Sequence, residues 1–386
     1  MTNRVHVATF LVALALTTFA PAQTFTTLYN FTGGSDGSEP WAGVIQDPAG
    51  NLYATTSFGG DLNCDHPWGC GVVYEVSTAG AETVLHSFSG SDGEKPGTPV
   101  ARDKAGNIYG TTSYGGSFSD GAVFKIDTAG SETVLYTFTG GSDGCHPDQG
   151  LVMDKAGSLY GTTVGCGSSD QGTVFKVDSA GNFTLLHSFV GQPSDGGAPA
   201  WGHLTMDRSS NLYGVTSGGG AYGNGALYRL SKSGTLTLLY SFKGGTDGCD
   251  PLGSVLQDKA GNLYGTANYC GSTGNGAIWK VNQKGKEITL HSFAGGTSDG
   301  CNPYAGVARD SKGNLYGVTS ACGANAYWGA LYELSARGKL TLLHSFDWSD
   351  GATPFAEVLR TTEGTLFGTT WQGGADGFGT VWKYVP

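Results

Sequence analysis

Few side chains in this sequence are spaced in a way that could support acid–base chemistry. Seven short apolar segments recur 51–56 residues apart, and their acidic residues are Asp148 and Glu357. One of the segments also carries His203. Two carboxylates about 5–10 Å apart can cleave a glycosidic bond, and a histidine can act as a general base. Asp148, His203 and Glu357 are therefore the candidate catalytic residues if the protein is a hydrolase.

Aromatic residues offer a second kind of chemistry, which is binding without catalysis. Three of the seven apolar segments begin with Trp41, Tyr304 and Phe355, and a fourth begins with Trp201. Flat rings with a polar edge suit the faces of sugars, although such rings also pack between structural units. The candidate ligand-binding residues are Trp41, Trp68, Asp148, Trp201, His203, Tyr304, Phe355 and Glu357.

Eight cysteines provide the third kind of chemistry, and their spacing predicts disulfides. Three pairs are 21 residues apart and occupy the same two positions of a repeat: Cys145/Cys166, Cys249/Cys270 and Cys301/Cys322. The other repeats lack both cysteines, so the two positions are expected to be in contact. Cys64 and Cys70 lie in the one repeat with a longer loop and are expected to bond to each other. A zinc site there is the less favoured alternative, because it would need further ligands.

These residues are set in seven copies of one unit. The phrase "GNLYGTT" recurs at positions 53, 109, 160, 213, 264, 316 and 367, and "LHSF" or a variant precedes an Asp-Gly pair seven times. The Asp-Gly aspartates could bind calcium, but sevenfold recurrence favours a structural turn. The histidines of "LHSF" alternate with tyrosine, so they are also interpreted as repeat structure.

The residue pattern of each unit predicts four short β-strands. In the second unit these are residues 99–103, 107–112, 121–126 and 132–138, all bounded by Gly, Asp, Asn or Ser. No segment shows helical periodicity over ten residues. Four antiparallel strands in about 52 residues, repeated seven times, are typical of an all-β, seven-bladed β-propeller.

The two ends of the chain test this architecture. The first repeat is preceded by an isolated fourth strand, residues 25–31, and the chain ends after a third strand, residues 379–384. Seven complete blades require residues 25–31 to pair with the last blade. This closure would remove the free sheet edges that an open solenoid exposes.

The repeat resembles that of the secreted bacterial GloVer tandem-repeat proteins. The likeness rests on "GNLYGTT…GG…G-x-V-F-K" followed by "LLHSF-x-GG-x-DG-x-x-P", which recurs through nearly the whole chain. The resemblance implies β-propeller-like repeats, but it brings no established ligand, reaction or catalytic residue. The family carries varied C-terminal sorting anchors, and none is recognised before the final residues Val385-Pro386. A weaker likeness, in "D-x-x-G-N-L-Y", is to gluconolactonase-like propellers.

The ends and the charge indicate where the protein works. Arg4, the apolar residues 7–16 and the small residues 20–22 predict a signal peptide at 1–22, followed by one propeller domain at 23–386. The apolar stretch is too short to span a bilayer. The net charge is −11, without a basic patch, which argues against nucleic-acid binding.

The sequence favours an exported, non-catalytic propeller that binds a glycan or a protein on its disulfide-bearing face. The alternative is an extracellular hydrolase or gluconolactonase-like lactonase that works through Asp148, His203 and Glu357. We expect a monomer with no cofactor and no metal site.

Overall fold

Each repeat folds into an antiparallel four-stranded blade. In the computed structural model, which describes residues 23–199, 202–325 and 327–386, the second repeat forms strands in the sheet order β6-β7-β8-β9. These strands are β6 (Ala101–Arg102), β7 (Ile108–Thr112), β8 (Ala122–Ile126) and β9 (Glu132–Thr137). They match the four strands predicted for this repeat, except that the innermost strand has only two residues.

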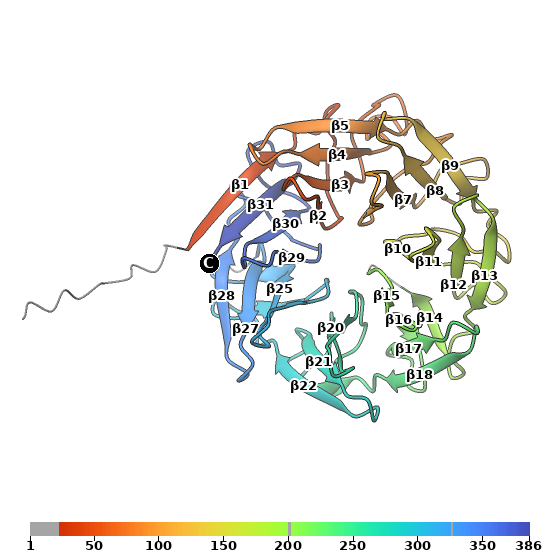
Figure 1. The fold of residues 1–386 in the computed structure, drawn as a ribbon. Helices are drawn as coiled ribbons and strands as arrows, with labels where there is room; N and C mark the ends of the chain where they lie inside the picture. Colours follow the sequence, from red (N-terminus) through yellow and green to blue (C-terminus); the bar gives the residue numbers. More distant parts are fainter. Residues whose placement is uncertain (1–22, 200–201, 326) are drawn as a thin grey trace, which may run out of the picture.

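Seven such blades make a ring in the described part of the chain, as Figure 1 shows, so the predicted seven-bladed propeller is confirmed. Blade 1 contains β2 (Ile45–Gln46), β3 (Leu52–Thr56), β4 (Val72–Val76) and β5 (Glu82–Ser87). Blade 2 is β6–β9, and blade 3 contains β10 (Val152–Met153), β11 (Leu159–Thr163), β12 (Thr173–Val177) and β13 (Phe183–Ser188). Blade 4 contains β15 (Thr205–Met206), β16 (Leu212–Gly219), β17 (Ala226–Leu230) and β18 (Leu236–Ser241), with β14 (Gly196–Pro199) also paired to β16.

The remaining blades complete the ring. Blade 5 contains β19 (Leu256–Gln257), β20 (Leu263–Ala267), β21 (Ala277–Val281) and β22 (Glu287–Ser292), and a 3₁₀ turn, η1 (Gly245–Asp247), precedes it. Blade 6 contains β24 (Ala308–Arg309), β25 (Leu315–Thr319), β27 (Ala330–Leu334) and β28 (Leu340–Ser345), with β23 (Gly300–Cys301) and β26 (Ala321–Cys322) as a separate pair. Blade 7 contains β29 (Leu359–Arg360), β30 (Leu366–Thr370), β31 (Thr380–Val385) and β1 (Thr24–Asn30).

The core lies between blades, where one phenylalanine meets one aromatic ring of the next blade. The phenylalanine that ends each "LHSF" phrase is completely buried, and the ring centroids of each pair are 5.0–6.0 Å apart. The pairs are Phe31–Tyr74, Phe88–Phe124, Phe138–Phe175, Phe189–Tyr228, Phe242–Trp279, Phe293–Tyr332 and Phe346–Trp382. Each buried ring contributes about 1.5–3 kcal/mol of transfer free energy.

The glycine of "LYGTT" makes room for this contact. A Cβ at Gly110 would lie 2.5 Å from Cζ of Phe124, and one at Gly265 would lie 2.3 Å from Cζ2 of Trp279. The aromatic ring therefore lies directly on the backbone of the neighbouring strand in its own blade. Blade 1 has Ala54 at this position, opposite Tyr74.

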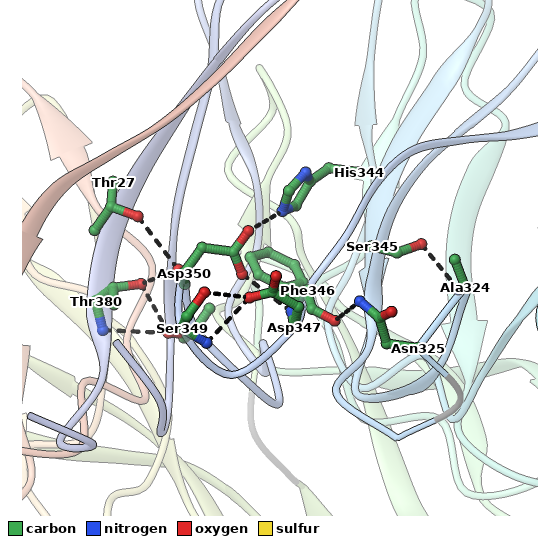
Figure 2. A network of polar contacts seen from close by, with 11 residues as sticks. Thr27, Ala324, Asn325, His344, Ser345, Phe346, Asp347, Ser349, Asp350 and Thr380 are labelled. Carbon is green, nitrogen blue, oxygen red and sulfur yellow. Dashed lines mark hydrogen bonds and ion pairs between the residues drawn. The ribbon is translucent and has the colours of Figure 1, made fainter. Parts of the chain in front are cut away.

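Contacts within the same blade stabilise each Asp-Gly turn. In all seven, the aspartate contacts the His or Tyr of "LHSF" at 2.6–3.1 Å and accepts a hydrogen bond from a backbone N–H just after the phenylalanine. Figure 2 shows the last of them, where His344 Nε2 lies 2.7 Å from Asp350. These contacts agree with the interpretation of the aspartates and histidines as repeat structure.

The ring closes as the sequence predicts. Strand β1 pairs antiparallel with β31, the first strand of the described chain with the last. Phe25 of β1 stacks on His344 of blade 6 at 3.6 Å, and Thr27 donates a hydrogen bond to the Asp350 carbonyl (Figure 2). With this pairing, each of the seven blades in the described part of the chain has at least four strands.

All four predicted disulfides are present. The pairs Cys145–Cys166, Cys249–Cys270 and Cys301–Cys322 have Cα atoms 5.3–5.4 Å apart, and Cys64–Cys70 closes the longer loop of blade 1. The second cysteine of each long-range pair has a positive φ of 59–65°, and glycine occupies this position in the other four blades. A Cβ at Gly59, for example, would lie 2.4 Å from Cα of Gly37. The loops that carry the two cysteine positions therefore approach so closely that the second position holds either a glycine or a cysteine bonded to the first.

The predicted signal peptide, residues 1–22, lies outside the described residues. Among the described residues, no helix is long and apolar enough to cross a membrane.

Deleting residues 24–31 should open the ring. The deletion removes β1 and the Phe31–Tyr74 contact, so we expect the free energy of unfolding to fall by more than about 3 kcal/mol, measured by denaturant titration. Thr26→Ala is the matched control, because Thr26 is exposed on β1. A truncated protein as stable as this control would contradict the closure argument.

Asp143→Asn should lower stability in a pH-dependent way. Burial opposes ionisation of Asp143, but hydrogen bonds from Thr139 and Tyr136 outweigh it and lower its pKa. The ionised form therefore stabilises the fold above about pH 4, and this stabilisation is lost as the pH falls through the lowered pKa. We expect a loss of about 1–3 kcal/mol at neutral pH that shrinks towards about pH 3. Asp376→Asn, at an exposed site, should leave thermal unfolding unchanged.

Candidate functional site

The same backbone feature recurs in every blade on the face that carries the disulfides. Before the inner strand of every blade, a residue with positive φ (49–57°) is followed by proline. Its backbone N–H donates a hydrogen bond to the preceding blade, and the proline packs on a glycine of that blade. This residue, called here the joint residue, is Glu39, Lys95, His146, Ala198, Asp250, Asn302 or Thr353. The backbone is fixed at each joint, whereas the side chain is free to differ.

Two of the joint residues border a cavity that extends over blades 7, 1, 2 and 3. Its volume is about 690 Å³, within the usual range for small-ligand sites. The lining residues are Glu39, Trp41, Ser57, Phe58, Asp65, Trp68, Lys95, Gly97, Thr98, Ser113, Tyr114, Asp148 and Trp371. This cavity is called here the aromatic pocket, because five of these residues carry aromatic rings.

The pocket is open above blade 2 because the inner segment of that blade begins with glycine. In the corresponding place, blades 1 and 3 carry Trp41 and Asp148, and blade 7 carries Phe355. A Cβ at Gly97 would face Oγ of Ser57 at 3.2 Å and Cβ of Trp41 at 4.0 Å. A side chain at position 97 would therefore enter the pocket.

The inner wall of the pocket is a stack of aromatic rings. Trp41 stacks on Phe355 with centroids 4.6 Å apart and planes 12° apart, and Trp371 packs against both rings. Tyr304 meets Phe355 edge-on at 4.7 Å. The structure thus brings Trp41, Tyr304 and Phe355 together, although only Trp41 lines the pocket itself.

Glu39 holds this wall in place. The indole Nε1–H of Trp371 donates a hydrogen bond to Oε2 of Glu39 at 2.7 Å. Burial raises the pKa of the Glu39 carboxyl, and hydrogen bonds from Trp371 and Trp41 oppose the rise only in part. Glu39 therefore positions the two tryptophans that form the inner wall.

The outer wall comes from the longer loop of blade 1. Trp68 lies in the loop closed by Cys64–Cys70 and is 61 % exposed. From the same loop, Asp65 forms an ion pair with Lys95 at 3.1 Å. The disulfide therefore constrains two pocket residues.

Lys95 fills the gap between two rings of the pocket. Its Nζ lies 5.3 Å from the ring centre of Phe58 and 5.2 Å from that of Tyr114, within cation–π range. Nζ also lies 3.2 Å from Glu94. Burial alone would lower the pKa of Lys95, but Asp65 and Glu94 together raise it, so the lysine is charged at neutral pH.

Asp148 differs from the other charged residues of the pocket. Its Oδ1 is shielded from solvent and has no hydrogen-bond partner among the described residues. Burial raises the pKa of its carboxyl, against the lowering effects of the hydrogen bond from Ser113 and of nearby His146. Asp148 lines this pocket, whereas Glu357 lines the central cavity, and Trp41 and Gly97 line both.

His203 and Glu357 meet at the centre of the ring. His203 Nδ1 lies 3.5 Å from Oε2 of Glu357 and 2.8 Å from Oγ of Ser254. A serine nucleophile needs the Nε2 of the histidine while the carboxylate holds Nδ1, whereas here both groups share Nδ1. The adjoining cavity, which Glu357 lines, has only about 20 Å³, room for about one water molecule. Trp201, another predicted ligand-binding residue, lies outside the described residues.

Sequence reasoning missed Glu39, Lys95, Phe58 and Tyr114. A signal for the first two is present: each precedes the proline of its repeat, where residue types change from blade to blade. Trp371, which also lines the pocket, is not among the candidate ligand-binding residues of the sequence analysis either. The roles of Phe58 and Tyr114 follow only from their contact with Lys95.

The fold has many relatives among solved structures. A streptogramin B lyase aligns with a TM-score of 0.60 and 13 % identity over 94 % of this chain and 97 % of the lyase. The extracellular domain of BT4673 from B. thetaiotaomicron, described as a hybrid two-component system, gives 0.61 and 10 % identity over 93 % of this chain and 39 % of that one. A Bacteroides uniformis protein described as a 6-phosphogluconolactonase gives 0.51 and 18 % identity over 79 % and 84 %. At these identities the likeness shows the propeller fold alone.

No curated protein matches the sequence. The model of the Gloeobacter/Verrucomicrobia repeat matches residues 15–163 and 146–382, which agrees with the resemblance seen in the repeats. Because these matches span nearly the whole chain, the protein belongs to the Gloeobacter/Verrucomicrobia repeat family.

Proposed function

We propose that this protein is an exported propeller that binds a carbohydrate in the aromatic pocket and does not act on it chemically. The observation that carries the proposal is a 690 Å³ cavity with rings on its inner and outer walls and charged groups between them. Rings of this kind contribute large contact area to a sugar face with little loss of conformational freedom. The carboxylates and Lys95 supply hydrogen-bond partners for hydroxyl groups.

Two further features support export and binding. Four disulfides are expected in an oxidising compartment, in agreement with the predicted signal peptide. The pocket is built on loops that a closed ring and a disulfide hold in place, and such preorganisation lowers the entropic cost of binding.

The hydrolase alternative has less support. Asp148 lies in the aromatic pocket, whereas His203 and Glu357 meet at the ring centre beside a cavity of about 20 Å³. The three candidate catalytic residues therefore do not face one substrate-sized space, and Ser254 and Glu357 compete for the same imidazole nitrogen.

Trp68→Ala should weaken carbohydrate binding. Isothermal titration against cello-, xylo- and chito-oligosaccharides should find at least one ligand whose affinity falls about tenfold in the variant, because a stacking ring contributes about 1–1.5 kcal/mol. Tyr222→Ala is the matched control: Tyr222 is 54 % exposed and does not line the pocket. Absence of any saccharide binding, or equal losses in both variants, would refute the proposal.

Gly97→Leu should prevent saccharide binding, because the leucine side chain would occupy part of the aromatic pocket. Position 97 does not have a positive φ, and Leu252 occupies the corresponding place in blade 5, so the backbone accepts the change. We expect loss of saccharide binding with the melting temperature of the parent protein nearly retained. Unchanged affinity in a folded Gly97→Leu variant would place the ligand elsewhere.

A further inference from the structure

The charged side chains that line the aromatic pocket are balanced, with one exception. Asp65 pairs with Lys95, and Glu39 accepts a hydrogen bond from Trp371. Asp148 is the exception: Ser113 and His146 act on its carboxyl, but its Oδ1 is buried without a hydrogen-bond partner among the described residues. A buried polar atom without a partner is costly, and a ligand that supplies a donor recovers that cost.

The charge around Asp148 favours a cationic donor over a neutral one. Lys95 is already shared by Asp65 and Glu94, so these three groups together carry one negative charge. Glu39 and Asp148 add further carboxylates, and burial raises the pKa of both. An ammonium group would stabilise an ionised Asp148 through a charge-assisted hydrogen bond, which is roughly twice as strong as a neutral one.

The shape of the pocket indicates what carries this ammonium group. A lysine side chain of a peptide would seek a narrow aromatic cage, but the cage of Phe58 and Tyr114 is occupied by Lys95 of the chain itself. The remaining space is broad and bounded by the indole rings of Trp41, Trp68 and Trp371. This shape suits a flat sugar ring with an amino substituent at its edge.

We infer that the aromatic pocket selects a glycan containing a free amino sugar, a 2-amino-2-deoxyhexose whose ammonium group pairs with Asp148. The inference rests on the proposed carbohydrate binding and adds its chemical class. Asp148 is thus a specificity-determining residue: it distinguishes the amine from the hydroxyl or the acetamide at the same carbon.

Two ligands that differ only at that carbon test the inference. Fully deacetylated chitohexaose and cellohexaose share a β-1,4-linked backbone, with an amine in the first where the second has a hydroxyl. Titration at about pH 6, below the ordinary α-amino pKa of about 7.7–8.0, should give at least tenfold tighter binding of the amino ligand. Fully N-acetylated chitohexaose should bind no better than cellohexaose.

Asp148→Asn should remove this preference without removing binding. We expect the two affinities to come within about twofold of each other, because the affinity for the amino ligand falls far more than that for cellohexaose. Asp148→Ala should behave in the same way, and blade 2 already has Gly97 in the corresponding place, so the fold accepts a small residue there. Asp250→Asn is the matched control, because Asp250 is a half-buried joint residue on the same face that does not line the pocket.

The outcomes separate the two proposals. Equal binding of both hexasaccharides by the parent protein would overturn the amino-sugar inference and leave carbohydrate binding intact. Binding of neither would overturn both. Tighter binding of a lysine hexapeptide than of the amino hexasaccharide, sensitive to Asp148→Asn, would overturn the inference in favour of a peptide ligand.

Discussion

The contact between one phenylalanine and one aromatic ring of the next blade is the interaction on which the rest of this structure depends. It recurs at all seven interfaces of the described ring, including Phe31–Tyr74, which joins the last blade to the first. The glycine of "LYGTT" allows the second ring of the pair to lie against its own blade. The seven phenylalanines are completely buried, so each pair removes apolar area from water at a blade interface.

Because the seven repeats are so similar, the residues that line the pocket are found where single repeats differ from the others. The joint residue has the same backbone conformation in every blade, but its side chain differs from blade to blade. Glu39 and Lys95 occupy two of these positions. Gly97 leaves a space where other blades place a larger side chain, and the longer loop of blade 1 adds Asp65 and Trp68. The aromatic pocket arises where these three departures from the repeat meet.

The fold could be predicted from the sequence because the same pattern of strands and turns recurs in all seven repeats. Blade number, ring closure and all four disulfides followed from counting and from cysteines that occur in pairs. The site was only partly predictable. Trp41 and Asp148 were found from their position, but their separation from His203 and Glu357 depends on which side chains fill the ring centre. The role of Lys95 depends on a positive φ before proline, and no propensity rule assigns that geometry to lysine.

The pairing of β1 with β31 also determines when the protein can finish folding. Strand β1 is the first of the described strands and β31 is the last, so the ring stays open until β31 has been synthesised. Until then, β1 has no partner strand, and the first six blades assemble without a seventh to join them. For the export proposed above, this delay matters because translocation through a membrane channel requires an unlocked polypeptide.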